Sequence, residues 1–244
     1  MREWLTGKNP VYEALLVNRR HFFNLLIQQD TRVEGKLKEI LDLAKQYNIP
    51  TRQANKQQLG QIDRHHQGVA LEASEYPYMA LEDLIAHSKQ QAEAPFFLLL
   101  DLIQDPQNLG SLLRTAELMN VHGVIIPSSQ AAQVTPTVVH ASSGATEHLL
   151  IAQYNLAQAI NRLKQLDLWV YGLDASSDAK TPDQLNLNGG VALVVGNEGE
   201  GLRNLVRKNC DEILRLPQYG KIDSLNAAVA GSIALYLARQ ARQN

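Results

Sequence analysis

The chain has 244 residues, 45% of them hydrophobic and 20% charged, so it can bury one large core or two smaller ones and is not disordered. Its 23 Lys and Arg residues are balanced by 25 Asp and Glu residues, and this net charge of −2 excludes histone-like binding of nucleic acid through bulk charge. A single cysteine, Cys210, excludes an intramolecular disulfide and a cysteine-rich zinc site. No apolar stretch approaches the ~20 residues of a membrane span, and the start of the chain lacks a signal-peptide core, so we expect a soluble cytoplasmic protein with no membrane partner.

Local patterns in the first 76 residues predict a small α/β unit. Helices are expected at 10–17 and 36–47, and strands at 22–28 and 68–73. We therefore predict a first domain over residues 1–74. A linker with a polar helix is expected over residues 75–93.

Strands and helices alternate regularly from residue 95 onward. Strands are predicted at 96–103, 123–127, 149–154, 169–173, 191–196 and 212–216. Helices are predicted at 109–120, 137–148, 156–166, 201–209 and 224–240. The first strand begins with a continuous apolar run at 96–100, which is typical of a strand buried on both faces. The alternation predicts a mostly parallel sheet, covered on both faces, in a second domain over residues 94–244.

Three segments lie where a predicted strand ends and a helix begins, the edge at which open α/β sheets bind ligands. In the first segment, Asp105 and Asn108 are typical turn and cap residues. Arg114 lies away from the apolar stripe of the following helix. It either forms a solvated pair with Glu117 or points toward the strand ends as a functional group.

The second segment, residues 194–202, is a glycine-rich turn between a buried strand and a helix. Its glycines do not have the G-x-G-x-x-G spacing, and Glu198 and Glu200 would repel a phosphate at this position. The turn therefore suits a neutral or cationic ligand. The alternative is a tight connection in which glycines supply positive φ angles.

The third segment, residues 216–232, leads into the last predicted helix, which Asp223 or Ser224 can cap. The first turns of this helix are rich in small residues, namely Ala227, Ala228, Ala230 and Gly231. Their size predicts a close approach by other backbone, a partner helix or a ligand, with ordinary tight helix packing as the alternative.

Taken in this order, the three segments resemble the signature motifs of the SpoU (TrmH) family of AdoMet-dependent RNA ribose 2′-O-methyltransferases, in the SPOUT superfamily. Asn108, Gly110 and Arg114 match N-x-G-x-x-x-R; Gly196, Glu198, Gly199 and Gly201 match G-x-E-G-x-G; Ser224, Leu225 and Asn226 match S-L-N. Residues 7–15 and 66–69 resemble the two ends of the family's substrate-binding domain. The resemblance covers nearly the whole chain and is closest to the two-domain 23S rRNA guanosine-2′-O-methyltransferases.

The resemblance implies an α/β fold in which a SPOUT domain, knotted as a trefoil and with a mostly parallel sheet, follows a small L30e-like α/β substrate-binding domain. It also implies a homodimer with each site completed near the dimer interface. AdoMet would be the methyl donor, held in the knot, and no metal would take part. The implied cofactor contacts are Val195, Gly196, Asn197, Gly201, Leu216, Leu225, Asn226 and Ala228.

The implied reaction is an in-line attack of a ribose 2′-oxygen on the methyl group of AdoMet. The residues that would carry it are Asn108, Arg114, Glu198, Ser224 and Asn226. Arg114 is the general base often proposed in the family, but a guanidinium has a pKa above about 12. Gripping a phosphate and stabilising the forming alkoxide is an equally good role for it. Asn108 and Asn226 would position the nucleotide or Arg114, and Glu198 would orient Arg114 or the donor.

The chain departs from the family pattern at Ala228, where the family often has serine, and at residues 117–119, where small residues are frequent. These departures bear on substrate specificity. Contacts with RNA phosphates are expected from basic residues of the first domain, namely Lys8, Arg19, Arg20 and Arg64. His65 and His66 are interpreted as turn or packing residues.

Three alternatives to an rRNA-modifying enzyme remain open in the sequence. One is a methyltransferase acting on a guanosine of tRNA. Another is an RNA-binding protein that has kept the fold and lost the chemistry, which the presence of Arg114, Glu198 and Asn226 disfavours. The third is a nucleotide-dependent oxidoreductase, which the acidic turn and the absent G-x-G-x-x-G disfavour.

Overall fold

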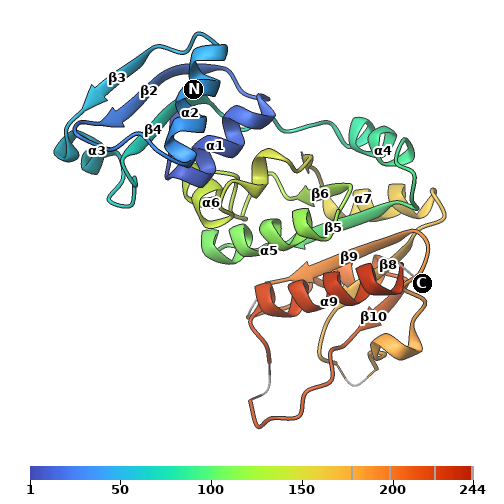
Figure 1. The fold of residues 1–244 in the computed structure, drawn as a ribbon. Helices are drawn as coiled ribbons and strands as arrows, with labels where there is room; N and C mark the ends of the chain where they lie inside the picture. The colour runs from blue at the N-terminus through green and yellow to red at the C-terminus, as the bar shows by residue number, and fades with distance from the viewer. Residues whose placement is uncertain (177, 198, 223, 243–244) are drawn as a thin grey trace. The chain divides into compact units, whose positions relative to one another are not determined.

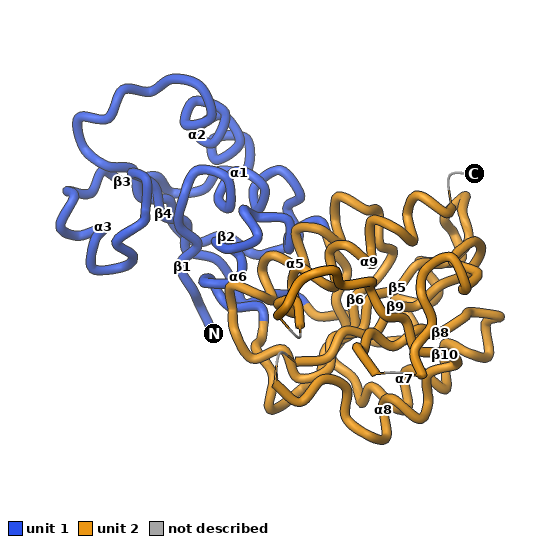
Figure 2. The backbone as a smooth tube through the Cα atoms, turned by 90° about the horizontal axis from the view of Figure 1, so that it is seen from below, with its two compact units in different colours: residues 1–77, 134–148 blue, residues 78–133, 149–244 orange. Residues whose placement is uncertain are grey.

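The computed structural model describes residues 1–176, 178–197, 199–222 and 224–242. The chain forms two compact units, one of residues 1–77 with 134–148 and the other of residues 78–133 with 149–244 (Figure 2). This division differs from the expected one in two respects. Residues 134–148 group with the first unit, and most of the expected linker belongs to the second.

Residues 1–77, all of which the structure describes, contain one four-stranded sheet in the order β1-β4-β2-β3 (Figure 1). Its strands are β1 (Arg2–Thr6), β2 (Phe22–Gln28), β3 (Thr51–Ala54) and β4 (Val69–Ser74). The helices are α1 (Lys8–Val17), α2 (Lys36–Gln46) and α3 (Lys56–Ile62). The β2–β3 pair is parallel, while β4 runs antiparallel to both β1 and β2.

Three elements of this unit were not predicted. β1 is a short strand, and β3 is an edge strand whose first three residues are exposed, so neither has a long hydrophobic pattern. α3 buries only Leu59, but it begins with a capping box in which Asn55 and Gln58 bond each other's backbone N–H groups. That capping box is a sequence signal that could have predicted the helix.

The helix predicted at 137–148 is broken into α6 (Pro136–Ala141) and a 3-10 turn, η1 (Ala145–Glu147). The break lies at Ser143 and Gly144, which have φ angles of 56° and 89°. A Cβ atom at Gly144 would lie 2.9 Å from the Glu13 side chain and 3.1 Å from the Pro10 Cα atom. Close packing of this segment against α1 therefore interrupts the helix and joins the segment to the first unit.

In the described part of the second unit, six strands form a sheet in the order β10-β8-β9-β5-β6-β7, and every strand pair is parallel. The strands are β5 (Phe96–Asp101), β6 (Gly123–Ile126), β7 (Ile151–Gln153), β8 (Trp169–Leu173), β9 (Val191–Gly196) and β10 (Glu212–Leu214). The helices are α4 (Leu81–Lys89), α5 (Pro106–Leu118), α7 (Leu156–Lys164), α8 (Asn204–Asn209) and α9 (Ala227–Ala241), with a 3-10 turn, η2, at Pro182–Gln184. The predicted parallel sheet is confirmed. The trefoil knot stays a prediction.

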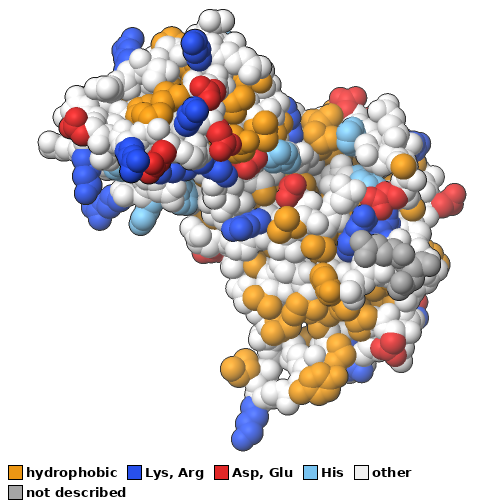
Figure 3. All heavy atoms as spheres, in the orientation of Figure 1, with side chains coloured by type: hydrophobic (Ala, Val, Ile, Leu, Met, Phe, Trp, Pro, Cys, Tyr) orange, Lys and Arg blue, Asp and Glu red, His pale blue; other side chains and the backbone are white. Residues whose placement is uncertain are grey.

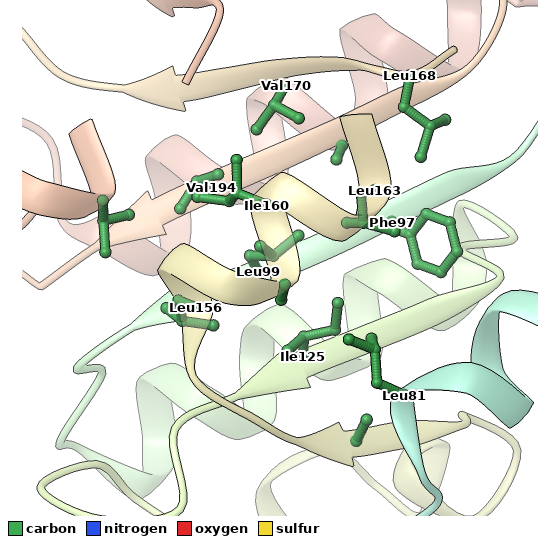
Figure 4. Close-up of a cluster of buried hydrophobic side chains, with 14 of the residues drawn as sticks. Leu81, Phe97, Leu99, Ile125, Leu156, Ile160, Leu163, Leu168, Val170 and Val194 are labelled. Atoms are coloured by element: carbon green, nitrogen blue, oxygen red, sulfur yellow. The ribbon is translucent and has the colours of Figure 1, made fainter. Parts of the chain in front are cut away.

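Helices cover both faces of this sheet. One face packs against α4, α7 and α8 in a hydrophobic cluster that includes Leu81, Phe97 and Ile160 (Figure 4). On the other face, α5 and α9 pack together, and a Cβ atom at Gly231 would lie 2.5 Å from the Leu112 side chain and 3.1 Å from Val195. Because Leu81, Leu84 and Ile85 are buried in the first layer, α4 is an integral helix of the second unit.

A charged cluster lies where β5 begins. Glu93 accepts hydrogen bonds from Asn120 and Arg239 and contacts His122 Nε2 at 3.2 Å, while His122 Nδ1 accepts the Phe96 N–H at 3.1 Å. Burial lowers the pKa of His122 more than Glu93 raises it. Burial raises the pKa of Glu93, but the hydrogen bonds from Arg239, His122 and Asn120 outweigh it and lower that pKa overall.

The free energy of unfolding is expected to fall as the pH is lowered through the range in which His122 and then Glu93 take up protons. His122 is held neutral in the fold, so its contribution is complete above its ordinary pKa of 6.5 and is lost as the pH falls through its lower folded value. Below about pH 4.5 the loss of the Glu93 charge adds to the effect. Thermal unfolding of the wild type and His122→Asn between pH 8 and 5 tests this. The wild type should lose more stability over this range, and parallel curves would contradict the prediction.

Candidate functional site

The three segments singled out in the sequence meet at one edge of the parallel sheet. Asp101, which ends β5, pairs with Gly196, which ends β9. Leu173 at the end of β8 pairs with both Val195 and Leu214, so β10 ends beside them. The loops that follow these strands therefore emerge side by side, as expected for parallel strands.

Among the described residues, the loops that follow β8, β9 and β10 line an open cavity of about 340 Å³, to which the loop after β5 contributes no residue. The predicted residues that line it are Val195, Gly196, Asn197, Gly201, Leu216, Ser224 and Leu225. Asp174, which follows β8, also lines the cavity and was not predicted. Asn226 and Ala228 lie elsewhere, in a second hollow between α5 and α9 that also includes Asn108.

The glycine-rich turn folds back on the end of β9. Asn197 and Gly201 exchange backbone hydrogen bonds of 3.2 and 3.1 Å. A Cβ atom at Gly196 would lie 2.3 Å from the Gly201 carbonyl carbon, and Gly201 itself has φ +67°. Asn197 Oδ1 accepts the N–H groups of Gly199 and Glu200, both at 2.9 Å. Close approach of the backbone thus explains the glycine at 196, and a positive φ explains the glycine at 201. Glu198 lies outside the described residues.

Two asparagines from motifs that are far apart in the sequence contact each other. Asn226 is the N-cap of α9, because its Oδ1 accepts the N–H groups of Ala228 and Val229. Its Nδ2 donates to Asn108 Oδ1 at 3.2 Å, across 118 residues of sequence. The prediction that Asp223 or Ser224 caps this helix is wrong for Ser224, since the helix begins later, and Asp223 lies outside the described residues.

Asp105 caps α5 as predicted, accepting the N–H groups of Gln107 and Asn108 at 2.7 and 2.9 Å. Arg114 is exposed on this helix, away from its buried stripe. The buried residues of that stripe are Leu109, Gly110, Leu112, Leu113 and Ala116. The structure therefore joins Asn108 to Asn226, places Ser224 at the cavity and leaves Arg114 on the surface of the same helix as Asn108.

Sequence reasoning assigned no role to Asp101, whose side chain is fully buried. It binds Arg203, with 2.7 Å between Asp101 Oδ1 and Arg203 Nε. A carboxylate at the end of an apolar strand is unusual, because a buried charge needs a partner. The position of Asp101 at the end of an apolar run could therefore have indicated, from the sequence alone, that this residue has a charged partner.

The basic residues of the first unit have different environments. Arg20 is buried, with its guanidinium on Glu147 at 2.8 and 2.7 Å and on Glu3. Its prediction as an RNA contact is therefore corrected: it is an internal ion-pair residue. Arg19 donates to the Glu147 carbonyl oxygen and to the Tyr76 hydroxyl.

Lys8 and Arg64 remain at the surface, half-buried and exposed respectively. The Lys8 N–H donates to Gln67 Oε1 at 3.0 Å, which joins the two segments that resemble the ends of a substrate-binding domain. His66 is a buried turn residue, as predicted, and its Nδ1 accepts the Gly68 N–H.

Within the described ranges, no three His, Cys, Asp or Glu side chains are grouped so that they could hold a metal ion. Of the helices that the structure describes, none is long and apolar enough to span a membrane.

A family model described as the SpoU rRNA methylase family matches residues 95–236, which include the cavity and all three segments. The chain belongs to this family. A second model, described as RNA 2′-O ribose methyltransferase substrate binding, matches residues 4–79. The SpoU-family chain thus has a substrate-binding domain followed by a methylase domain, and the expected family and two-domain α/β fold with a parallel sheet are confirmed.

Relatives named as TrmH family tRNA/rRNA methyltransferases match almost the whole chain. YacO of Bacillus subtilis is 39% identical over 238 residues, covering 96% of this chain and 94% of YacO. A Staphylococcus saprophyticus relative is 37% identical, covering 95% of this chain and 93% of its own. The SpoU-family chain is therefore a TrmH/SpoU-type RNA methyltransferase.

Solved structures share the fold of both units. AviRb from Streptomyces viridochromogenes, a SpoU methyltransferase solved in complex with AdoMet, has a TM-score of 0.81 and 22% identity, covering 98% of this chain and 90% of AviRb. An AdoMet-bound rRNA methyltransferase from Sinorhizobium meliloti has a TM-score of 0.80 and 24% identity, covering 98% and 87%.

Proposed function

We propose that this chain transfers the methyl group of AdoMet to the ribose 2′-hydroxyl of a guanosine in 23S rRNA, in the cytoplasm. The observation that carries the proposal is that the glycine-rich turn after β9 and the segment between β10 and α9 line one cavity of about 340 Å³. Ribosomal RNA is favoured by the extent of the shared fold. The Sinorhizobium rRNA methyltransferase matches 98% of the chain, whereas a tRNA-modifying TrmH/SpoU enzyme of A. aeolicus matches 67% with a TM-score of 0.56.

The cavity suits AdoMet in size and charge. Its volume lies within the range of about 300–1,000 Å³ of small-molecule sites. Leu173, Leu214 and Leu216 supply apolar surface. Glu200 and Asp174, the latter paired with Arg207 at 3.3 Å, place carboxylates at the cavity, which favours a ligand of net positive charge. AdoMet supplies an electrophilic sulfonium methyl group. We propose Val195, Gly196, Asn197, Gly201, Leu216 and Leu225 as its contacts.

The residues of α5 would act on the RNA. A guanidinium stays protonated in nearly every protein setting, so Arg114 would bind the phosphate beside the target ribose and stabilise the 2′-alkoxide. This lowers the pKa of the 2′-hydroxyl, whose proton would pass to solvent water rather than to Arg114 as the oxygen takes the methyl group and S-adenosylhomocysteine leaves. The bond between Asn108 and Asn226 would hold α5 and α9 in register around the nucleotide. Ser224 would add a hydrogen bond at the cavity, and we propose that Glu198 orients Arg114.

A methylation assay with labelled AdoMet tests the proposed function. Purified protein is given unmodified rRNA and total tRNA in separate reactions, and labelled riboses are mapped by their resistance to alkaline cleavage. Label at one position of 23S rRNA is expected. Label in tRNA would support the proposed methyl transfer but would overturn the proposal that rRNA is the substrate. AdoMet binding without label in either RNA would favour a catalytically silent RNA-binding protein.

Replacing Gly196 by alanine is expected to weaken AdoMet binding at least about tenfold. The new Cβ atom would lie 2.3 Å from the Gly201 carbonyl carbon, and this neighbour is backbone that can move only by displacing the turn. Isothermal titration with AdoMet measures the effect. Gly60→Ala is the matched control, because nothing lies within 4 Å of its Cβ position. If the Gly196 variant bound AdoMet as tightly as the wild type does, the glycine-rich turn would not be part of the AdoMet site.

Lys8→Ala and Arg64→Ala are each expected to weaken RNA binding and to reduce its salt dependence. A lysine or arginine on a phosphate releases about one counterion, so the slope of log K against log salt should become shallower by about 1 for each. Filter binding between 50 and 200 mM salt provides the measurement. If the slope of log K against log salt were unchanged in both variants, the RNA would bind at a surface that includes neither residue.

We also propose that the chain is a homodimer. Hydrophobic side chains gather on the face of the second unit where α9 lies (Figure 3). On this helix Val229, Ile233 and Tyr236 are 48%, 39% and 51% exposed. Light scattering after size exclusion tests this, with Ile233→Asp expected to give the monomer. A wild-type monomer at micromolar concentration would overturn the dimer.

A further inference from the structure

The Asp101 carboxylate binds both the side chain and the backbone N–H of a single residue, Arg203. Its Oδ1 accepts a hydrogen bond from Arg203 Nε at 2.7 Å, and its Oδ2 accepts the Arg203 backbone N–H at 2.9 Å. The Asp101 side chain is 0% exposed, while that of Arg203 is 43% exposed. We name this pair the Asp101–Arg203 clamp.

The clamp closes the far end of the glycine-rich turn. The near end of the turn is Gly196, whose partner in the sheet is Asp101 itself. The chain then folds back through the Asn197–Gly201 backbone bonds, and Arg203 returns it to β5 across 102 residues of sequence. Both ends of the turn are therefore fixed to the same residue of the central strand.

The turn between these two points faces the cavity. Asn197, Gly199 and Gly201 line it, whereas Asp101 and Arg203 are not part of that lining. The next residue, Leu202, is buried against Gly172, where a Cβ atom would lie 2.6 Å from its side chain. Movement at Arg203 would thus be transmitted to the cavity wall through only a few residues.

Stability alone does not account for a charge at this position. A buried ion pair can often be replaced by apolar residues of similar volume at little cost in stability. An apolar side chain at 101 would leave the Arg203 N–H without its acceptor. The backbone also turns sharply here, since Leu102 has φ +58°, a conformation that non-glycine residues rarely adopt. The arrangement therefore specifies a loop geometry.

We propose that Asp101 and Arg203 are positioning residues for the methyl donor: the clamp holds the glycine-rich turn in the shape that binds AdoMet, without touching AdoMet. This inference rests on the proposed function. Loss of the clamp should act on donor binding. The arginine and asparagine of α5, which we assign to the RNA, keep their places, so KM for AdoMet should rise more than kcat falls.

Asp101→Asn tests the clamp with little change in shape. The amide keeps one acceptor oxygen but loses the charge, and hydrogen bonds to charged groups are strong enough that Kd for AdoMet should rise about 10- to 100-fold. Arg203→Gln should have a similar effect. The double variant should be no worse than either single one, because it leaves no unpaired buried charge. Glu82→Gln, which breaks the exposed pair with Arg162 in the same unit, is the matched control and should bind as the wild type does.

Isothermal titration with AdoMet and with S-adenosylhomocysteine needs no turnover, and hydrogen exchange at Gly201 and Arg203 reports the turn directly. In the folded variants, faster exchange at these two amides than at amides far from the turn is expected, together with weaker donor binding. A wild type that does not bind AdoMet would overturn the proposed function. A wild type that binds AdoMet while folded Asp101→Asn and Arg203→Gln bind it equally well would overturn only the clamp. Arg203→Gln decides the matter if Asp101→Asn does not fold, because its side chain is partly exposed in the fold.

Discussion

Arg114→Ala is expected to lower methyl transfer by at least about 10²- to 10³-fold, the usual loss when one group that stabilises an oxyanion is removed. Affinity for AdoMet should not change, because Arg114 is exposed on α5 and is not among the residues that line the cavity. Single-turnover kinetics with saturating RNA and AdoMet measure the first quantity. Isothermal titration with AdoMet measures the second.

Two further variants identify the role of Arg114. Arg114→Lys keeps the positive charge and should retain part of the activity if the residue binds phosphate and stabilises an alkoxide. Arg162→Ala removes an exposed arginine of the same unit, which is paired with Glu82, and should be as active as the wild type. Turnover by Arg114→Ala at the wild-type rate would remove this residue from the reaction.

Glu147→Ala is expected to destabilise the protein by about 3–5 kcal/mol, because it leaves the buried Arg20 charge without its bidentate partner. The guanidinium would keep only Glu3 and the Ser74 carbonyl oxygen. Urea denaturation followed by far-UV circular dichroism measures the loss.

A double variant separates the unpaired charge from lost packing. Arg20→Met with Glu147→Leu removes both charges of the buried pair and leaves only Glu3, a carboxyl whose pKa burial already raises and which can take up a proton, so its stability should lie above that of Glu147→Ala. Glu82→Gln, in an exposed pair, should change stability little. If the double variant is as unstable as Glu147→Ala, packing rather than charge determines the effect.

Elements with a strong local pattern were predictable. The strand at 96–101 begins with five consecutive apolar residues and proved to be buried throughout, and the alternation after it correctly predicted a parallel sheet. Elements with weak patterns were not: β3 has one buried residue, and α3 has one. Periodicity reports how a segment buries its own side chains, so elements that bury almost nothing leave little trace of it.

The sequence by itself determined the class of fold, the order of the three motifs and the placement of each at a strand end, because these follow from local periodicity and residue type. Only the tertiary structure decided which side chains meet. It joined Asn226 to Asn108 and Asp101 to Arg203, and it buried Arg20 against Glu147. These partners lie more than 100 residues apart, and no local pattern specifies such a pairing. It arises because parallel strands bring their carboxyl ends to one edge and because buried charges must find partners.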